Sequence, residues 1–210
     1  MKRTSLGSLT LAVALALGAA FAAEAAGPRP ATTWVAPTAD EIADMTWMRE
    51  EEKLARDLYL AFDEAWGTLP FASIAASEQR HMDAMLRTLV KNRLPDPVAG
   101  NAIGEFTEPR LQSLFADMLA RGLASEAEAL KAGGLVEEVD IRDNLDAAAA
   151  TTKPDLDSTY AALTCGSRNH LRAFAYTLKL VTGETYTAQF LPQAEVDAIL
   201  AAPLERCGRP

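Results

Sequence analysis

The chain has 210 residues and only two histidines, His81 and His170. Glu78 precedes His81 by three residues, and on a helix this Glu-x-x-His spacing places a carboxylate beside an imidazole on one face. Carboxylate-bridged di-metal sites in helical bundles combine such pairs with acids from other helices. A single match is common by chance, and a lone buried histidine is more often a hydrogen-bonded core residue. The pair therefore gains meaning only if further acids share its interior.

The other long segments of the chain each place an acid or an imidazole within a mostly apolar stripe. Steps of three and four residues give Glu52, Glu137 and His170 apolar neighbours on their own helices, and Asp140 follows Glu137 by three residues. A buried carboxylate costs several kcal/mol unless it is paired, protonated or bound to a metal. We therefore predict a shared cation among six residues: Glu52, Glu78, His81, Glu137, Asp140 and His170.

The elements that position these residues are predicted to be helices. Glycine and proline interrupt the chain near 67–70, 94–97, 153–154 and 183, and the segments between them are rich in residues that favour helix. We predict an all-α protein with four long helices, at 38 or 40 to 66, 71–93, 125–150 and 155 or 157 to 182, and short helices at 108–121 and 193–202. Two tight hairpins joined by one long crossover, which carries the first short helix, are the connectivity of a ferritin-like four-helix bundle.

The two hairpins also set the heights of the candidate ligands. Counted from a turn near residue 68, Glu52 lies 16 residues before it and His81 lies 13 residues after it. At about 1.5 Å per residue the offset is roughly 4–5 Å, which side chains can span. Glu137 and His170 have a similar offset about a turn near residue 152. We expect the ligands in one layer, although periodicity leaves Glu51 open as an alternative to Glu52.

Simple ion pairs offer a metal-free interpretation of the same acids. The run 50–53 (EEEK) can form a solvated face on which Glu52 pairs with Arg56. Arg172 can likewise satisfy Glu137 inside a bundle. The protein would then be a binding or structural module of the cell envelope. A third alternative is a protein that holds one metal ion without turnover.

Composition narrows the classes of partner. The chain has 29 Asp and Glu against 20 Lys and Arg, a formal net charge of −9. A nucleic-acid partner is not expected, because neutralising phosphates requires basic residues. Two cysteines exclude a disulfide-dense scaffold and a Cys-based zinc module. In an oxidising compartment, Cys165 and Cys207 can form a disulfide.

The N-terminus has the pattern of a secretory signal peptide. Lys2 and Arg3 precede a mostly apolar run at 6–23, and small residues at 20–25 offer A-x-A cleavage sites. An uncleaved membrane anchor is the alternative. We predict an exported protein, in the periplasm or outside the cell, with no membrane association after cleavage. The expected parts are a signal peptide at 1–25, an extended leader at 26–37, the bundle at 38–192, and a short helix and tail at 193–210.

Four stretches around the candidate ligands resemble a known family. They are 50–57 (EEEKLARD), 77–84 (SEQRHMDA), 136–141 (VEEVDI) and 166–174 (GSRNHLRAF). The chain is similar, over roughly residues 38–191, to the prokaryotic ferritin-like proteins grouped as a domain of unknown function, number 2202 in that series. The resemblance implies a ferritin-like four-helix bundle, in the superfamily of di-iron oxidases, ferritins and rubrerythrins. It implies no particular activity.

The superfamily pattern implied by this resemblance has a Glu on the first long helix, Glu-x-x-His on the second, a Glu on the third and Glu-x-x-His on the fourth. The residues that fit are Glu52, Glu78, His81, Glu137 and His170. Ser167 stands where the fourth helix should carry its Glu. We infer that Asp140 supplies the missing oxygen ligand.

A mixture of oxygen and imidazole ligands suits iron or manganese, and less specifically zinc. We expect two iron ions that act on O2, peroxide or a metal substrate. Tyr59, seven residues after Glu52, is similar to the tyrosine near ferritin oxidation centres. The residues expected to orient the ligands are Glu51, Tyr59, Arg80, Asn169 and Arg172.

Overall fold

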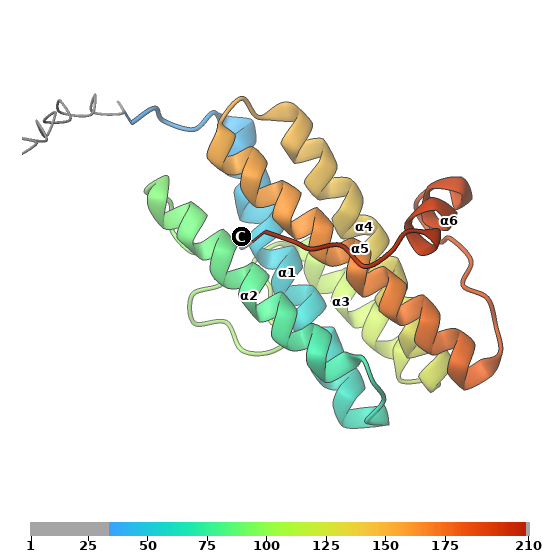
Figure 1. Cartoon of the computed structure of the whole chain (residues 1–210). Coiled ribbons are helices and arrows are strands. Elements are labelled where there is room, and N and C mark those ends of the chain that lie inside the picture. Colours follow the sequence, from blue (N-terminus) through green and yellow to red (C-terminus); the bar gives the residue numbers. More distant parts are fainter. Residues whose placement is uncertain (1–33, 209–210) are drawn as a thin grey trace, which may run out of the picture. The chain divides into compact units, whose positions relative to one another are not determined.

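Six helices form the part of the chain that the computed structural model describes, residues 34–208 (Figure 1). They are α1 (Ala39–Trp66), α2 (Phe71–Lys91), α3 (Pro109–Gly122), α4 (Glu126–Ala150), α5 (Pro154–Thr182) and α6 (Gln193–Ala201). This described part contains no strand, so the predicted all-α class is confirmed. The predicted signal peptide and most of the predicted leader lie outside it, and residues 34–38 precede the first helix without helical structure.

Local sequence signals determine where the helices begin and end. Thr38 and Glu41 form a capping box at the start of α1, in which the Glu41 amide donates to Thr38 Oγ1 at 3.2 Å. At the start of α4, Ser125 Oγ accepts a hydrogen bond from the Glu128 amide at 3.2 Å. Gly67 ends α1 at φ 60° and Gly183 ends α5 at φ 79°, a left-handed conformation that suits glycine. Because these signals act locally, predicted and observed bounds differ by only about one or two residues.

The four long helices lie side by side as a helical bundle (Figure 1). α1 packs against α2, and α4 packs against α5, so each hairpin forms one pair. The pairs meet where α1 contacts α4 and α2 contacts α5, while α3 of the crossover covers α1 and α4. None of the helices within residues 34–208 combines the length and apolarity required to cross a membrane.

Two apolar clusters fill the interior of the bundle. The larger includes Tyr59, Phe71 and Phe174, and the smaller includes Met85 and Tyr160. Along α1, α2 and α5, buried polar residues within 50–53, 78–81 and 167–170 separate the two clusters. On α4, the buried polar residues within 137–140 lie between Val136 and Ile141 of the larger cluster, and Asn144 lies between Ile141 and Ala147 of the smaller one. A polar layer therefore crosses the bundle between two apolar regions.

Buried charges on α1 hold the crossover in place. Glu50 Oε2 accepts hydrogen bonds from the amides of Thr107 at 2.7 Å and Glu108 at 3.0 Å. Lys53 Nζ donates to the Ala102 carbonyl at 2.7 Å. Glu50 is 2% exposed and Lys53 is 1% exposed. The interpretation of this run as a solvated face is therefore wrong, because the crossover covers it.

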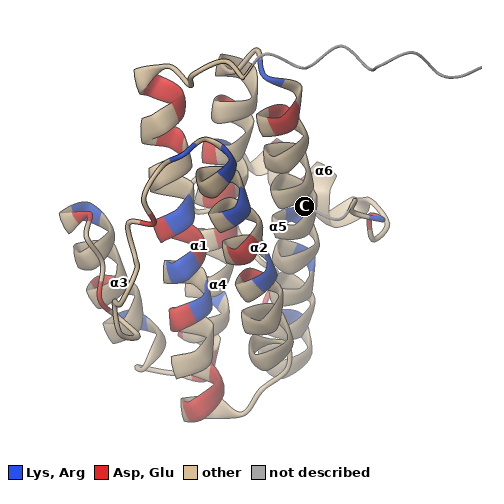
Figure 2. Cartoon of the chain, turned by 90° about the vertical axis from the view of Figure 1, so that its left-hand side faces the viewer, with Lys and Arg blue, Asp and Glu red and all other residues tan. Residues whose placement is uncertain are grey.

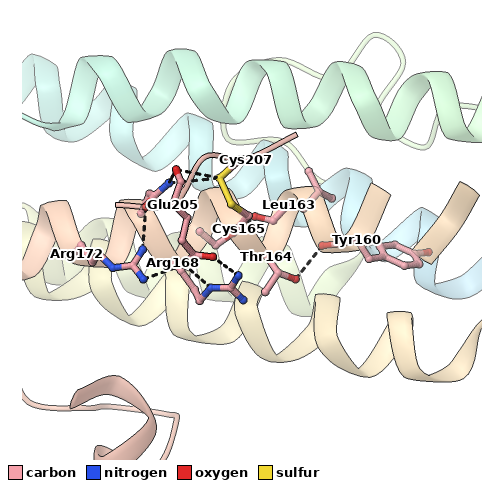
Figure 3. Close-up of a disulfide and its surroundings, with 10 residues drawn as sticks. Tyr160, Leu163, Thr164, Cys165, Arg168, Arg172, Glu205 and Cys207 are labelled. Atoms are coloured by element: carbon pink, nitrogen blue, oxygen red, sulfur yellow. Dashed lines mark hydrogen bonds and ion pairs between the residues drawn. A yellow bond between two sulfur atoms is a disulfide. The ribbon is translucent and has the colours of Figure 1, made fainter. Parts of the chain in front are cut away.

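The segment after α6 crosses the outer face of α5 (Figure 1; Figure 3). A disulfide joins Cys165 of α5 to Cys207. Glu205 forms ion pairs with Arg168 at 2.5 Å and Arg172 at 2.8 Å, both on α5. The C-terminal segment is thereby fixed to α5 at the height of the polar layer.

Candidate metal centre

Glu78 lies at the middle of the polar layer, because its two carboxylate oxygens approach two different histidines. Its Oε2 lies 2.7 Å from Nδ1 of His81, which is one helical turn later on α2. Its Oε1 lies 2.6 Å from Nδ1 of His170 on α5. The centroids of the two imidazole rings are 5.5 Å apart. One buried carboxylate therefore connects imidazoles from two helices.

A second carboxylate approaches each histidine, so the cluster has two halves, one around His81 and one around His170. Glu52 Oε2, from α1, lies 3.1 Å from Nδ1 of His81. Glu137 Oε2, from α4, lies 3.4 Å from Nδ1 of His170. Within each half, one ligand atom per residue lies within 4.8 Å of the others. Both halves share Glu78, so all four long helices contribute to one cluster.

Glu51 and Glu52 are adjacent in sequence but differ in their position relative to the cluster. Glu52 belongs to the half that contains His81, whereas Glu51 belongs to neither half. Glu51 is nevertheless only 2% exposed, and its Oε2 has no hydrogen-bond partner. The structure therefore brings Glu52 to His81 and leaves Glu51 buried beside the cluster.

The charges of the cluster are strongly coupled. Burial opposes ionisation of Glu78, but the neighbouring His170 and His81 hold the pKa of Glu78 well below its usual range. Burial also opposes protonation of His170, yet Glu78 and Glu137 raise the pKa of His170 to about 10. Glu52 and Glu78 raise the pKa of His81 against the same effect of burial. Both imidazoles therefore carry two protons near pH 7 in this arrangement.

The pKa values of the other carboxylates are raised, whereas the pKa of Glu78 is lowered. Burial raises the pKa of Glu52 and of Glu137, and neighbouring acids raise each pKa further. Burial, followed by the charge of Glu137, raises the pKa of Asp140 to about 7. The raised pKa values reflect carboxylates that are buried close to one another, and a bound cation would relieve this repulsion and favour their ionised forms.

Several polar atoms of the cluster lack a hydrogen bond. Glu52 Oε1, Glu78 Oε1 and His170 Nδ1 are buried without a partner, and the close approach of the last two does not have hydrogen-bond geometry. A buried polar atom left without a partner costs about 1–3 kcal/mol, so such atoms are rare. A metal ion accepts lone pairs from carboxylate oxygen and imidazole nitrogen alike. The residues present therefore fit a metal ion.

Tyr59 and Asp140 make polar contacts at the edge of the cluster. Tyr59 Oη donates to Glu137 Oε1 at 2.6 Å. Asp140 accepts from Ser167 Oγ and, at 2.9 Å, from Asn144 Nδ2. Asp140 belongs to neither three-residue group, so its role as a metal ligand stays a prediction. Ser167, which replaces the expected fourth-helix Glu, binds the acid inferred to substitute for it.

Gly166 makes room for His81 where α5 approaches α2. A Cβ at this position would lie 2.6 Å from both Cε1 and Nε2 of His81. Sequence reasoning did not identify Gly166, Ser167 or Asn144 as site residues. The available signal was an isolated glycine within a helix, which often marks a close approach to another element.

Three residues predicted to orient the ligands point elsewhere. Arg80 is exposed and donates to the carbonyl of Ala76, on its own helix. Asn169 and Arg172 bind Glu205 of the C-terminal segment, as Figure 3 shows for Arg172. Arg80 thus contacts its own helix, and the C-terminal segment engages Asn169 and Arg172, so the role of these residues in orienting the ligands stays a prediction that these contacts do not support.

The cations expected to neutralise Glu52 and Glu137 also bind elsewhere. Arg56 contacts Asp57 at 2.6 Å, and Arg172 contacts the C-terminal segment. The ion pairs of the metal-free interpretation are therefore not formed, and histidines are the groups that face both acids.

The fold and the site define a class of protein: a helical bundle with a buried layer of carboxylates and histidines. The chain belongs to the family described as "Uncharacterized protein domain (DUF2202)", whose profile matches residues 41–203. The predicted membership of this domain family is thereby confirmed, whereas its placement in the ferritin-like superfamily stays a prediction.

One relative comes from Methanocaldococcus jannaschii. The chain is 42% identical over 159 residues to "Uncharacterized protein MJ0754" of Methanocaldococcus jannaschii, which covers 76% of this chain and 85% of the relative. The crystal structure of the hypothetical protein MJ0754 from Methanococcus jannaschii DSM 2661 matches with a TM-score of 0.79 at 38% identity, covering 82% of this chain and 98% of that one. These names assign no activity.

Proposed function

We propose that this chain is an exported, ferritin-like protein that binds two metal ions in the buried cluster and uses them in redox chemistry with O2, peroxide or a metal substrate. The observation that carries the proposal is the position of Glu78. Its two oxygens approach His81 and His170 separately, and Glu52 and Glu137 each add an oxygen to one side. A carboxylate shared by two sets of nitrogen and oxygen ligands is the arrangement of a carboxylate-bridged dinuclear centre.

The helix order supports the ferritin-like part of this proposal. Two hairpins, α1 with α2 and α4 with α5, are joined by a crossover that carries α3. Ligand candidates follow the same order: a Glu on α1, Glu-x-x-His on α2, a Glu on α4 and a His on α5. One crossover and inward-facing acids on all four helices are typical of ferritin-like bundles.

The donor set suits iron best, with manganese or zinc as alternatives. Each half offers one imidazole nitrogen and oxygens from two carboxylates. Two divalent ions would balance four carboxylates if both imidazoles are neutral and Asp140 is ionised. Asp140 is the fourth acid of this balance because it is 5% exposed and is inferred to supply an oxygen ligand. Glu51 is also buried, and the balance takes it as protonated because burial raises its pKa well above the usual value.

Two bound ferrous ions would supply two electrons to O2 or peroxide. The protein residues would position the two ions and shield them from bulk water. Glu78 fixes the spacing between the two halves, and the Tyr59 hydroxyl holds a proton at Oε1 of Glu137. The apolar clusters on both sides of the layer exclude bulk water.

Export is the part of the proposal that rests on the N-terminal sequence. The disulfide between Cys165 and Cys207 supports it, because disulfides persist in oxidising compartments and are rare in reducing ones.

Metal analysis of protein purified without a chelator tests the proposed function. We expect about two ions per chain and oxidation of added Fe(II) by O2 or peroxide. Glu78→Gln is expected to hold at most one ion, because an amide cannot connect the two halves as a carboxylate does. Glu64→Gln, the same change at an exposed acid of α1, should keep wild-type loading.

Two other results would replace this proposal. One tightly held ion without turnover would identify a mononuclear protein. No bound ion, together with an unchanged melting temperature after addition of Fe(II), Mn(II) or Zn(II), would identify a metal-free module.

A further inference from the structure

An acidic cleft of about 780 Å³ lies between α1 and α4. Six acidic residues and one basic residue, Arg110, line it. Glu50 is already bonded to the crossover, and Glu108 pairs with Arg110 at 2.8 Å. Four aspartates remain: Asp40, Asp44, Asp143 and Asp146. Asp40 and Asp44 lie on the N-terminal turns of α1, and Figure 2 marks the acidic positions of the helices in red.

The aspartates of the cleft repel one another. Burial raises the pKa of Asp44, and the charge of Asp40 raises it further. Burial likewise raises the pKa of Asp143, with added repulsion from Asp146 and Asp44. The ion pair of Asp146 is a long one, because Arg142 Nη1 lies 4.0 Å from Asp146 Oδ1. A cleft lined by charges of one sign concentrates counter-ions and accelerates their arrival.

Trp47 and Glu51 connect this cleft to the buried cluster. Trp47 lines the cleft, and its Nε1 donates to Asp143 Oδ2 at 2.9 Å. Glu51 lies four residues after Trp47 on α1, so the two side chains are neighbours on one face of the helix. Glu51 also directly precedes Glu52 of the cluster. Glu51 is therefore adjacent both to a residue that lines the cleft and to a residue of the cluster.

The state of Glu51 provides an independent indication of a ligand. Its side chain is 2% exposed, and its Oε2 has no hydrogen-bond partner. It belongs to neither of the two three-residue groups, so the proposed dinuclear site does not use it. A cation that moves from the cleft into the protein loses part of its hydration water. A buried carboxylate oxygen beside the cleft can replace a lost water as a ligand.

We propose that the cleft collects divalent cations and that Asp143 and Glu51 transfer them to the buried carboxylate–histidine cluster. This inference rests on the proposed function, because the route requires a metal site at its inner end. The transfer exchanges oxygen ligands only, from Asp143 to Glu51 and then to Glu52. The two residues act on the rate of uptake and leave the final occupancy of the cluster unchanged.

Rapid-mixing measurements of Co(II) uptake by the metal-free, full-length protein test the route, because the visible absorption of Co(II) reports its own coordination. Glu51→Gln and Asp143→Asn are expected to slow uptake about tenfold or more, with the wild-type number of ions bound at equilibrium. Asp83→Asn removes the same charge from an exposed position on α2 and should leave the rate within about twofold of wild type.

Two outcomes would overturn the inference. Uptake at the wild-type rate in both Glu51→Gln and Asp143→Asn would exclude the route. Loss of one ion at equilibrium from Glu51→Gln would make Glu51 a permanent ligand instead. Failure of the proposed function is distinguishable from both, because the wild-type protein would then bind either no Co(II), and the route would fall with it, or a single Co(II) per chain.

Discussion

At the scale of single residues, the two histidines carry protons that a metal ion must displace. Glu78 and Glu137 raise the pKa of His170 to about 10, and Glu52 and Glu78 raise that of His81. Metal ions bind the neutral imidazole, so binding at pH 7 releases these protons. Affinity should therefore rise with pH up to the raised pKa values and fall by about a factor of ten per pH unit below them for each proton released.

Calorimetric titration with Zn(II) at pH 7, in buffers of different ionisation enthalpy, measures the number of protons released. We expect at least two per chain, one from each imidazole, and about one fewer in His170→Ala. Binding of Zn(II) with no proton release would contradict the assignment of these histidines as ligands.

At the scale of the helices, local signals made the element bounds predictable. Gly67, Pro154 and Gly183 act on the residues next to them, so no knowledge of the tertiary structure is needed. Periodicity also places Glu52 and Glu78 on inward faces. It cannot predict which element covers the opposite face of a helix, and for that reason Arg172 was expected at the cluster although it binds the C-terminal segment.

The choice between Glu51 and Glu52 on α1 is ambiguous in the sequence for a related physical reason. This helix buries side chains on nearly every face, because α2, α3 and α4 all contact it. The registers containing Glu51 and Glu52 are then equally apolar, and periodicity alone does not separate them. The hairpin geometry favours Glu52 by only one residue's rise, about 1.5 Å, so the sequence leaves the choice open and the structure brings Glu52 to His81.

The approach of α5 to α2 gives a prediction for Gly166. A Cβ there would lie 2.6 Å from the His81 ring, so Gly166→Ala must displace the histidine or separate the helices. Overpacking of this kind costs about 1–3 kcal/mol, which exceeds the gain of up to about 1 kcal/mol in helix propensity. We expect lower stability in urea and weaker Zn(II) binding.

Gly208→Ala is the matched control, because nothing lies within 4 Å of its added Cβ. It should unfold at the wild-type urea concentration. If Gly166→Ala proved as stable and as well loaded as Gly208→Ala, the close approach between Gly166 and His81 would not matter for the site.

At the scale of the whole molecule, stability and function occupy different layers. Apolar clusters on each side stabilise the bundle, whereas the polar layer between them contains buried acids and unpartnered atoms. Such a layer lowers stability unless a cation satisfies it. Additional constraints on the fold should therefore lie outside this layer, and the C-terminal segment on the outer face of α5 provides one (Figure 3).

The disulfide is expected to stabilise the fold without contributing to the cluster. It links residues 42 apart in sequence. Closing a loop of this size restricts the unfolded chain, and this stabilises the folded protein by about 2–4 kcal/mol. The double variant Cys165→Ala, Cys207→Ala should lose stability of this magnitude in urea, as should wild-type protein under reducing conditions. Its metal content should remain that of wild type, because Glu205 still holds the segment through Arg168 and Arg172 and all ligand candidates lie on helices. A large loss of metal from the double variant would instead show that the constraint on α5 positions His170.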